Sequence, residues 1–212
     1  MSFKAVIFDK DGVLINSFST VLSAMNEALT LYGYDKISGK EFRRSWWGIR
    51  ADLNIEMKLG ITREEALEIF ECYKQRREEL RGMTKPYPGV YGVLRELRGD
   101  YSLGVVTSTF RDVAMGLLDE FGISKFFDVV VGGDETKPKP APDPLLKACA
   151  GLMVRPDDAI YVGDTDADIC AGKSAGCTTV IVTTSKTKEE LDEIRGIIII
   201  DELKELLDIV NS

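Results

Sequence analysis

The fold is decided by the stretch Ala5-Val6-Ile7-Phe8-Asp9-Lys10-Asp11-Gly12-Val13-Leu14, in which a short apolar run ends in two carboxylates. Residues Ala5–Phe8 are apolar throughout, which is typical of a strand covered on both faces of a parallel sheet. Ligands gather at the carboxyl ends of such strands, and Gly12 permits a tight turn, so Asp9 and Asp11 can point into one site. A bare Asp-x-Asp is more often an ordinary acidic loop, so the interpretation depends on what other strand ends supply.

Further apolar runs recur along the chain, with helical patterns between them. The predicted strands are Ala5–Phe8, Leu103–Val106, Phe127–Val131, Ala159–Val162, Thr178–Val182 and Ile197–Ile200. Amphipathic segments such as Val113–Phe121 and Pro144–Ala150 lie between them and predict right-handed helical crossovers. We therefore expect an α/β fold built on a doubly wound, Rossmann-like parallel sheet.

One long segment, from about Ser17 to Met83, contains no convincing strand. It shows helical patterns at Thr20–Tyr32, Gly39–Trp47 and Arg63–Arg81, and Thr62 followed by Glu65 predicts a capping box for the last of these. We expect an α/β core domain made of residues 1–15 and 84–212, with an inserted all-α domain of residues 16–83.

The composition excludes several classes of function. A chain of 212 residues with 44% hydrophobic and 29% charged residues is globular, and a net charge of −8 argues against broad nucleic-acid binding. Histidine is absent, which removes Ser-His-Asp and Cys-His catalysis and leaves acid–base work to carboxylates, lysines or tyrosines. No apolar run reaches the roughly 20 residues that span a bilayer, and the apolar start is too short for a signal peptide. We therefore expect no membrane partner and a cytoplasmic location.

Two more predicted strands end in groups that suit a phosphate ester. Thr107 follows the second strand, where a hydroxyl and backbone N–H groups can bind phosphoryl oxygens, whereas Ser108 or Thr109 can cap the following helix. After the third strand comes a proline-stiffened segment with Lys137 and Lys139, and either ammonium can offset phosphate charge. An ordinary solvated loop accounts for the lysine segment about equally well.

The fourth strand is followed by the acidic stretch Gly163-Asp164-Thr165-Asp166-Ala167-Asp168. Mg²⁺ prefers hard oxygen ligands, and one carboxylate from the first strand with one from the fourth would hold it beside a phosphate. The alternative is an acidic cap on the following helix, which the helix dipole favours.

With these segments in this order, the chain resembles the haloacid dehalogenase (HAD) superfamily, and more narrowly its phosphoglycolate phosphatase and β-phosphoglucomutase-like branch. The motifs that carry the resemblance are Asp9-x-Asp11-Gly12-Val13, Thr107, Lys139-Pro140-x-Pro142 and Gly163-Asp164-x-x-x-Asp168. The helical insert sits where this branch carries its cap domain. The resemblance implies a Mg²⁺-dependent phosphomonoester hydrolase that acts on a small phosphorylated metabolite through an aspartyl-phosphate.

The resemblance also implies a role for each residue in phosphoryl transfer. Asp9 attacks the phosphorus, and Asp11 protonates the leaving oxygen and then takes a proton from water. Thr107 and the Ser108 backbone N–H hold the phosphoryl group. Lys139, which fits the family pattern better than the other lysine of its segment, screens charge between Asp9 and the phosphate.

The implied metal ligands are Asp9, the backbone carbonyl of Asp11, and Asp164. Asp168 is expected to act behind these direct ligands, and Asp166 is an additional acid that can compete as a ligand. In the insert, the resemblance places a loop near the active site, so Arg50 and Trp47 are expected to touch the leaving group. The alternative for Trp47 is a place in the core of the small helical domain.

Three other activities remain open to different degrees. A phosphohexomutase would share every core motif, and only its cap would differ. A dehalogenase needs neither a proton donor at Asp11 nor a metal, so Asp11 and Asp164 speak against it. A phospho-accepting receiver has its aspartate after a later strand and lacks a helical insert of this size.

Overall fold

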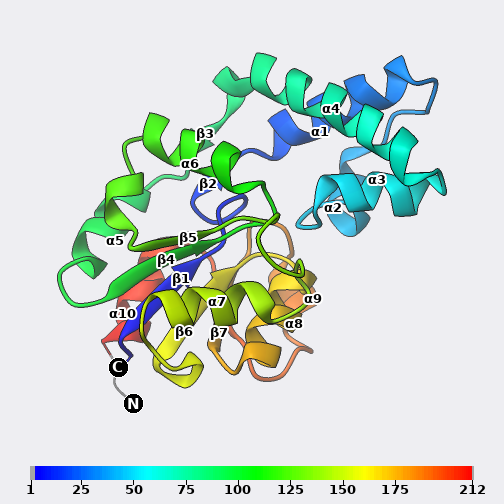
Figure 1. Cartoon of the computed structure of the whole chain (residues 1–212). Coiled ribbons are helices and arrows are strands. Elements are labelled where there is room, and N and C mark those ends of the chain that lie inside the picture. Colours follow the sequence, from blue (N-terminus) through cyan, green and yellow to red (C-terminus); the bar gives the residue numbers. More distant parts are fainter. Residues whose placement is uncertain (1–2, 212) are drawn as a thin grey trace. The chain divides into compact units, whose positions relative to one another are not determined.

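The structure, a computed structural model, describes residues 3–211 of the chain. It divides into two compact units, Met1–Ile15 with Pro86–Ser212 and Asn16–Lys85 (Figure 1). The connections between them run through two short strands, β2 (Ile15–Asn16) and β3 (Lys85–Pro86), which pair with each other.

The larger unit is built on a six-stranded sheet in which every pairing is parallel. Its strands are β1 (Ala5–Phe8), β4 (Ser102–Val106), β5 (Val129–Val131), β6 (Ala159–Gly163), β7 (Thr178–Val182) and β8 (Ile198–Ile200). They lie in the order β5-β4-β1-β6-β7-β8, and Phe8 of β1 is in register with Val105 on one side and Val162 on the other. The predicted parallel sheet is therefore confirmed.

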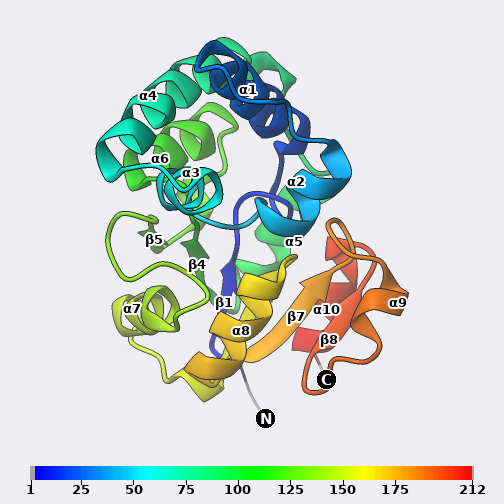
Figure 2. The same ribbon diagram turned by 90° about the vertical axis from the view of Figure 1, so that its right-hand side faces the viewer.

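Helices cover both faces of this sheet (Figure 2). They are α5 (Val90–Leu97), α6 (Arg111–Glu120), α7 (Asp143–Gly151), α8 (Asp166–Ala175), α9 (Lys188–Leu191) and α10 (Leu206–Val210), with 3₁₀ turns at Ser124–Phe126, Pro156–Asp158 and Leu203–Glu205. Along β1, Val6 and Phe8 belong to the core cluster that includes α5, α6 and α10, whereas Ala5 and Ile7 belong to the cluster that includes α7 and α8. A strand buried on both faces has no polar side to show, which is why its sequence is continuously apolar.

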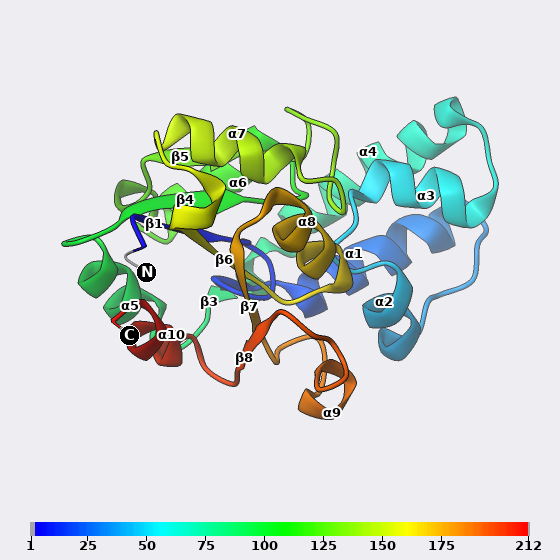
Figure 3. The ribbon, with the colours of Figure 1, turned by 90° about the horizontal axis from the view of Figure 1, so that it is seen from below.

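The strand order reverses its direction of growth at the central strand β1. From β1 the chain adds β4 and β5 on one side, and then crosses to add β6, β7 and β8 on the other. Such a reversal opens a crevice at the carboxyl ends of the strands, where ligands of doubly wound folds bind. In Figure 3 the strands of the sheet can be followed from β5 to β8 with α7 and α5 on opposite sides.

The smaller unit is all-helical, as predicted. Its helices are α1 (Phe18–Leu31), α2 (Gly39–Ser45), α3 (Ala51–Leu59) and α4 (Arg63–Glu79), followed by a 3₁₀ turn at Arg81–Met83. The predicted capping box is present, because the Thr62 side chain accepts the Glu65 backbone N–H while the Glu65 carboxylate accepts the Thr62 backbone N–H. Across residues 3–211, no helix combines the length and apolar character needed to cross a membrane.

Candidate active site

The residues proposed from the sequence lie at the carboxyl edge of the sheet. Asp9 and Asp11 follow β1, Thr107 follows β4, and Asp164 follows β6, so three neighbouring strands deliver them to one edge. Asp9 is 3% exposed and is tied back to the sheet, since its backbone N–H donates to the carbonyl of Val162 at 2.8 Å. Parallel pairing alone thus brings together groups that are about 150 residues apart in the sequence.

Lys139 lies among buried carboxylates. Its Nζ is 3.2 Å from Asp9 Oδ1 and 2.6 Å from Asp168 Oδ1, and it donates to the hydroxyl of Tyr161 at 3.1 Å. Lys137, the alternative in the same segment, is exposed. The structure therefore brings together Lys139 and not Lys137 with the proposed nucleophile.

Asp168 organises the cluster through both of its carboxylate oxygens. Oδ1 accepts from Lys139 and from the Tyr161 hydroxyl, each at 2.6 Å. Oδ2 accepts from the Thr165 hydroxyl at 2.6 Å and from the backbone N–H groups of Thr165 and Asp164 at 3.0 and 3.2 Å. These bonds include the capping box of α8, so the helix-cap alternative holds for Asp168 and coexists with its contact to Lys139.

Asp11 lies closer to solvent than Asp9, with a side chain that is 17% exposed. Its Oδ2 accepts from Lys10 Nζ at 2.5 Å and from the Thr109 hydroxyl at 2.9 Å. The side chain of Lys10 is wholly buried, and this ion pair supplies the counter-charge that a buried ammonium requires. Thr109 reaches Asp11 from the loop after β4, so the two strand ends are linked by a direct hydrogen bond.

Gly12 and Asp164 approach each other more closely than any side chain at position 12 would allow. Gly12 has a φ of +89°, and a Cβ built on it would lie 2.1 Å from Asp164 Oδ2. The backbone of the Asp-x-Asp loop therefore lies directly against the carboxylate of Asp164, which follows β6. The glycine is required both for its positive φ and for this contact.

The electrostatics of the cluster follow from burial. Burial raises the pKa of Asp9 well above its ordinary value, with Lys139 opposing the shift and Asp168 and Asp164 adding to it. Burial acts in the same direction on Asp168, but Lys139 and the hydrogen bonds to this carboxylate outweigh it and lower its pKa. Burial opposes the charged form of Lys139, yet the fields of Asp168 and Asp9 raise the pKa of its ammonium above the ordinary value. Lys139 is thus held as a cation, and Asp168 as its anionic partner.

The donor set fits a divalent cation. One oxygen from each of Asp9, Asp164 and Asp168 lies within 4.8 Å of the others, and all three residues are buried. Lys139 pairs with two of these three carboxylates, Asp9 and Asp168, so one ammonium does not balance the charge of all three when they are ionised. Hard carboxylate oxygens in this number are what Mg²⁺ prefers, with water completing its coordination.

Comparisons with known proteins show the family of this chain. The family model of the haloacid dehalogenase-like hydrolases matches residues 6–182. The chain belongs to this family. Its curated relatives include the phosphoglycolate phosphatase of Aquifex aeolicus, 35% identical over 181 residues that make up 84% of each chain. They also include the pyrophosphatase PpaX of Bacillus mycoides, 31% identical over 215 residues that cover 100% of this chain and 98% of the relative.

A solved structure shares this fold. The crystal structure of a hydrolase from Pseudomonas syringae superposes with a TM-score of 0.87 at 24% identity, over 98% of both chains. The predicted class, an enzyme of the HAD hydrolase family, is confirmed by the family match and by the curated relatives.

One residue of this cluster, Tyr161, is not predicted from the sequence, which places it only within an apolar strand. A buried tyrosine hydroxyl usually has a polar partner, and this is the signal that points to it. Burial also raises the pKa of Tyr161 well above its ordinary value, so its hydroxyl remains a donor. The suggestion that Ser108 or Thr109 caps the next helix is wrong, because α6 begins after Phe110 without a side-chain cap and Thr109 bonds to Asp11 instead.

The two insert residues proposed for substrate recognition are both part of the helical unit. Trp47 is 7% exposed, and its ring lies 5.2 Å from that of Phe18 and 6.4 Å from that of Phe42, measured between centroids. Arg50 is held by Asp52 through two bonds, from Nε at 2.8 Å and from Nη2 at 3.0 Å. These contacts favour a packing role for Trp47 and a fixed guanidinium at Arg50.

Proposed function

We propose that this protein is a Mg²⁺-dependent phosphomonoester hydrolase that acts on a small phosphorylated metabolite through an aspartyl-phosphate on Asp9. The observation that carries the proposal is the buried group of Asp9, Lys139, Asp164 and Asp168 at the carboxyl edge of the sheet. A carboxylate nucleophile, an ammonium and cation ligands are the parts that phosphoryl transfer requires.

In this proposal Asp9 and Asp11 divide the chemistry. Asp9 attacks the phosphorus, and a covalent intermediate splits one displacement into two easier ones. Asp11 protonates the leaving oxygen and later takes a proton from the water that hydrolyses the intermediate. The position of Asp11, partly exposed and oriented by the Thr109 hydroxyl, supports a group that exchanges protons with substrate and water.

The remaining groups bind and orient the phosphoryl oxygens. The Thr107 hydroxyl and the Ser108 backbone N–H would hold them at the end of β4, and Lys139 would offset their charge. Thr107 is 3% exposed, and its Oγ1 accepts the Thr109 backbone N–H at 3.1 Å, which fixes the turn of this loop. Asp168 keeps the ammonium of Lys139 in place at 2.6 Å.

The carboxylates of Asp9 and Asp164 and the backbone carbonyl of Asp11 would hold the metal ion. When bound, the ion supplies Lewis-acid stabilisation of charge on the phosphoryl group. The five donors to Asp168 support the view that this residue acts through Lys139 and Thr165 rather than as a direct ligand.

The helical unit would supply substrate selection as a cap. We propose that Arg50 binds the leaving group, since Asp52 holds its guanidinium by two bonds and its side chain remains 17% exposed. The matched variants are Arg50→Ala and Arg63→Ala, because Arg63 also pairs with Asp52, at 2.6 Å. Raised KM in the first variant alone supports the assignment, and unchanged kcat and KM in Arg50→Ala contradict it.

A panel of phosphate esters tests the function directly. Phosphoglycolate, pyrophosphate, sugar phosphates and para-nitrophenyl phosphate would be incubated with Mg²⁺, and released phosphate measured. Asp9→Asn should abolish release, whereas Asp166→Asn, which alters an exposed acid at the start of α8, should not. Absence of phosphate release from every ester, or undiminished release by Asp9→Asn, refutes the proposal; isomerised hexose phosphate as the main product indicates a mutase.

A further inference from the structure

The residues that follow β7 form a segment whose side chains bond to three different loops. We call residues 183–186 the hydroxyl segment, after the hydroxyls of its first three members. Its bonds are Thr183 Oγ1 to Asp201 Oδ1 at 2.9 Å, Thr184 Oγ1 to the Gly12 carbonyl at 2.6 Å, Ser185 Oγ to Asp164 Oδ2, and Lys186 Nζ to Asp166 Oδ2 at 3.0 Å. The segment therefore links the loop after β1 to the loop after β6.

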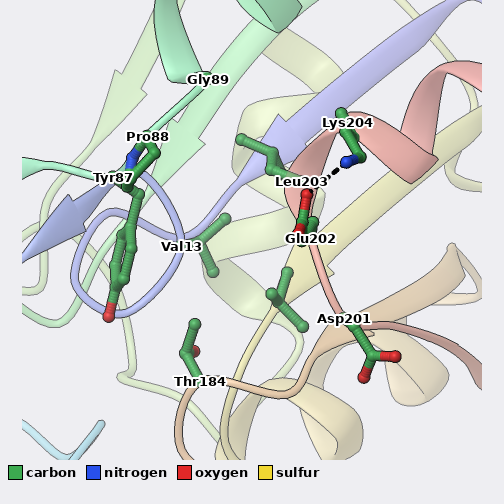
Figure 4. A pocket seen from close by; sticks show the side chains of 10 residues that line it. Val13, Tyr87, Pro88, Gly89, Thr184, Asp201, Glu202, Leu203 and Lys204 are labelled. Atoms are coloured by element: carbon green, nitrogen blue, oxygen red, sulfur yellow. Dashed lines mark ion pairs between the residues drawn. The ribbon is translucent and has the colours of Figure 1, made fainter.

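A cavity of about 330 Å³ borders this segment at Thr184. The cavity is also lined by Val182 at the end of β7 and by Val13 of the loop after β1. Figure 4 shows the side chains of Thr184 and Val13 facing this cavity together with Tyr87 and Leu203. Because a cavity gives its lining atoms few van der Waals partners, the bond from Thr184 to the Gly12 carbonyl carries more of the positioning of that side chain.

Ser185 acts on the carboxylate that Gly12 also contacts. Its hydroxyl donates to Asp164 Oδ2, the same oxygen that lies 2.1 Å from the position of a Cβ at Gly12. Asp164 is thus held between a backbone on the loop after β1 and a hydroxyl after β7. An ionised carboxylate can accept about four hydrogen bonds or ligand contacts, so a serine hydroxyl leaves capacity for a cation.

We propose that Ser185 is a positioning residue for the metal ligand Asp164, which it holds in the orientation that lets Asp164 share a divalent cation with Asp9. This inference rests on the proposed function, because it assumes that the carboxylates of Asp9 and Asp164 bind Mg²⁺. Groups that hydrogen-bond a metal ligand orient it and typically alter metal affinity 10–100-fold. Ser185 is placed to have this effect without touching the substrate's phosphoryl group.

Calorimetric titration of the metal-stripped full-length protein with Mg²⁺ tests the proposal. Ser185→Ala should weaken Mg²⁺ binding about 10–100-fold. The Mg²⁺ concentration for half-maximal phosphatase activity should rise by the same factor, while the substrate KM at saturating Mg²⁺ stays near its wild-type value. Ser185→Thr, which keeps the hydroxyl, should restore the affinity. Lys186→Gln is the neighbouring control. It removes the ion pair with the exposed acid Asp166 and should not weaken Mg²⁺ binding.

The possible outcomes separate this inference from the proposed function. If wild type binds Mg²⁺ and Ser185→Ala binds it equally well, the positioning role is overturned while the hydrolase proposal stands. If Ser185→Ala does not fold, Ser185→Cys replaces it, since a thiol is a weak donor of similar shape and should also weaken binding. Wild-type affinity in that folded cysteine variant overturns the role too. If wild type itself neither binds Mg²⁺ nor releases phosphate, both proposals fail.

Discussion

Gly12→Ala should lower the activity of this protein about 10²-fold by displacing Asp164, and not by unfolding the chain. Two effects follow from the added methyl group. The φ of +89° becomes strained for any residue with a Cβ, at a cost of about 1–2 kcal/mol. In addition, the new Cβ would lie 2.1 Å from Asp164 Oδ2, and the two atoms have to separate to at least 3.4 Å for an ordinary contact.

Moving these two atoms from 2.1 Å to at least 3.4 Å apart is a large displacement for a catalytic site. Misplacing a reacting or positioning group by about 1 Å can lower the rate about 10²-fold. Since each factor of ten corresponds to about 1.4 kcal/mol, the barrier should rise by about 3 kcal/mol. Weaker Mg²⁺ binding should accompany this loss, because Asp164 is a proposed ligand.

Gly176→Ala is the matched control. Gly176 lies in the same unit, at the end of α8, with a φ of +85°, but a Cβ there would meet no atom within 4 Å. Urea unfolding should show a similar loss of stability in both variants, whereas only Gly12→Ala should lose kcat/KM and Mg²⁺ affinity. Wild-type activity and Mg²⁺ affinity in a folded Gly12→Ala would refute the reasoning.

Three further predictions concern the buried cluster. Because burial raises the folded pKa of Asp9, its contribution to stability is present below its unfolded pKa and is lost as pH rises through the folded value. In EDTA, Asp9→Asn should therefore become more stable than wild type as pH rises. The difference should grow by up to about 1.4 kcal/mol per pH unit between the unfolded and the folded pKa of Asp9. A difference in unfolding free energy that is the same at all pH values, measured with urea, would contradict this. Tyr161→Phe removes the hydroxyl that donates to Asp168 at 2.6 Å and should cost about 1.5–3 kcal/mol of unfolding free energy; an unchanged urea midpoint would show that the bond contributes nothing. Thr165→Val and Thr62→Val each remove an N-cap hydroxyl and should each lower the free energy of unfolding by about 1 kcal/mol. Only Thr165→Val should lower kcat, because Thr165 bonds to Asp168. Equal kcat in both variants argues against that coupling.

The sheet and the strand-end residues could be predicted because both depend on local patterns. A continuously apolar run predicts a strand covered on both faces, and parallel pairing then fixes which end of it faces the crevice. Asp9, Thr107 and Asp164 follow directly from this rule. The rule needs no knowledge of side-chain contacts. It therefore applies to this chain although the sequence contains no histidine and no single decisive motif.

Partners that come from tertiary contacts could not be predicted in the same way. Lys10 looks like a solvated loop lysine, and only the fold shows that its side chain is wholly buried against Asp11. Ser185 is one hydroxyl among several in a polar loop, and its contact with Asp164 depends on how β6 and β7 pair. The helix α3 is not predicted because its buried face carries Asp52 and Asn54, which a hydrophobic pattern does not reveal.

The two aspartates of the Asp-x-Asp stretch are identical in sequence terms but receive different environments from the fold. Asp9 is 3% exposed and lies against Lys139 among buried carboxylates, whereas the Asp11 side chain is 17% exposed and accepts from Lys10 and Thr109. Catalytic pairs of like groups are assigned their roles by such differences in surroundings. A buried carboxylate next to fixed positive charge suits attack on phosphorus, because it is oriented and shielded from water. A carboxylate at the rim, oriented by a hydroxyl, can exchange its proton with water between the two steps. The proposed division of labour therefore rests on the fold around each aspartate and not on their order in the chain.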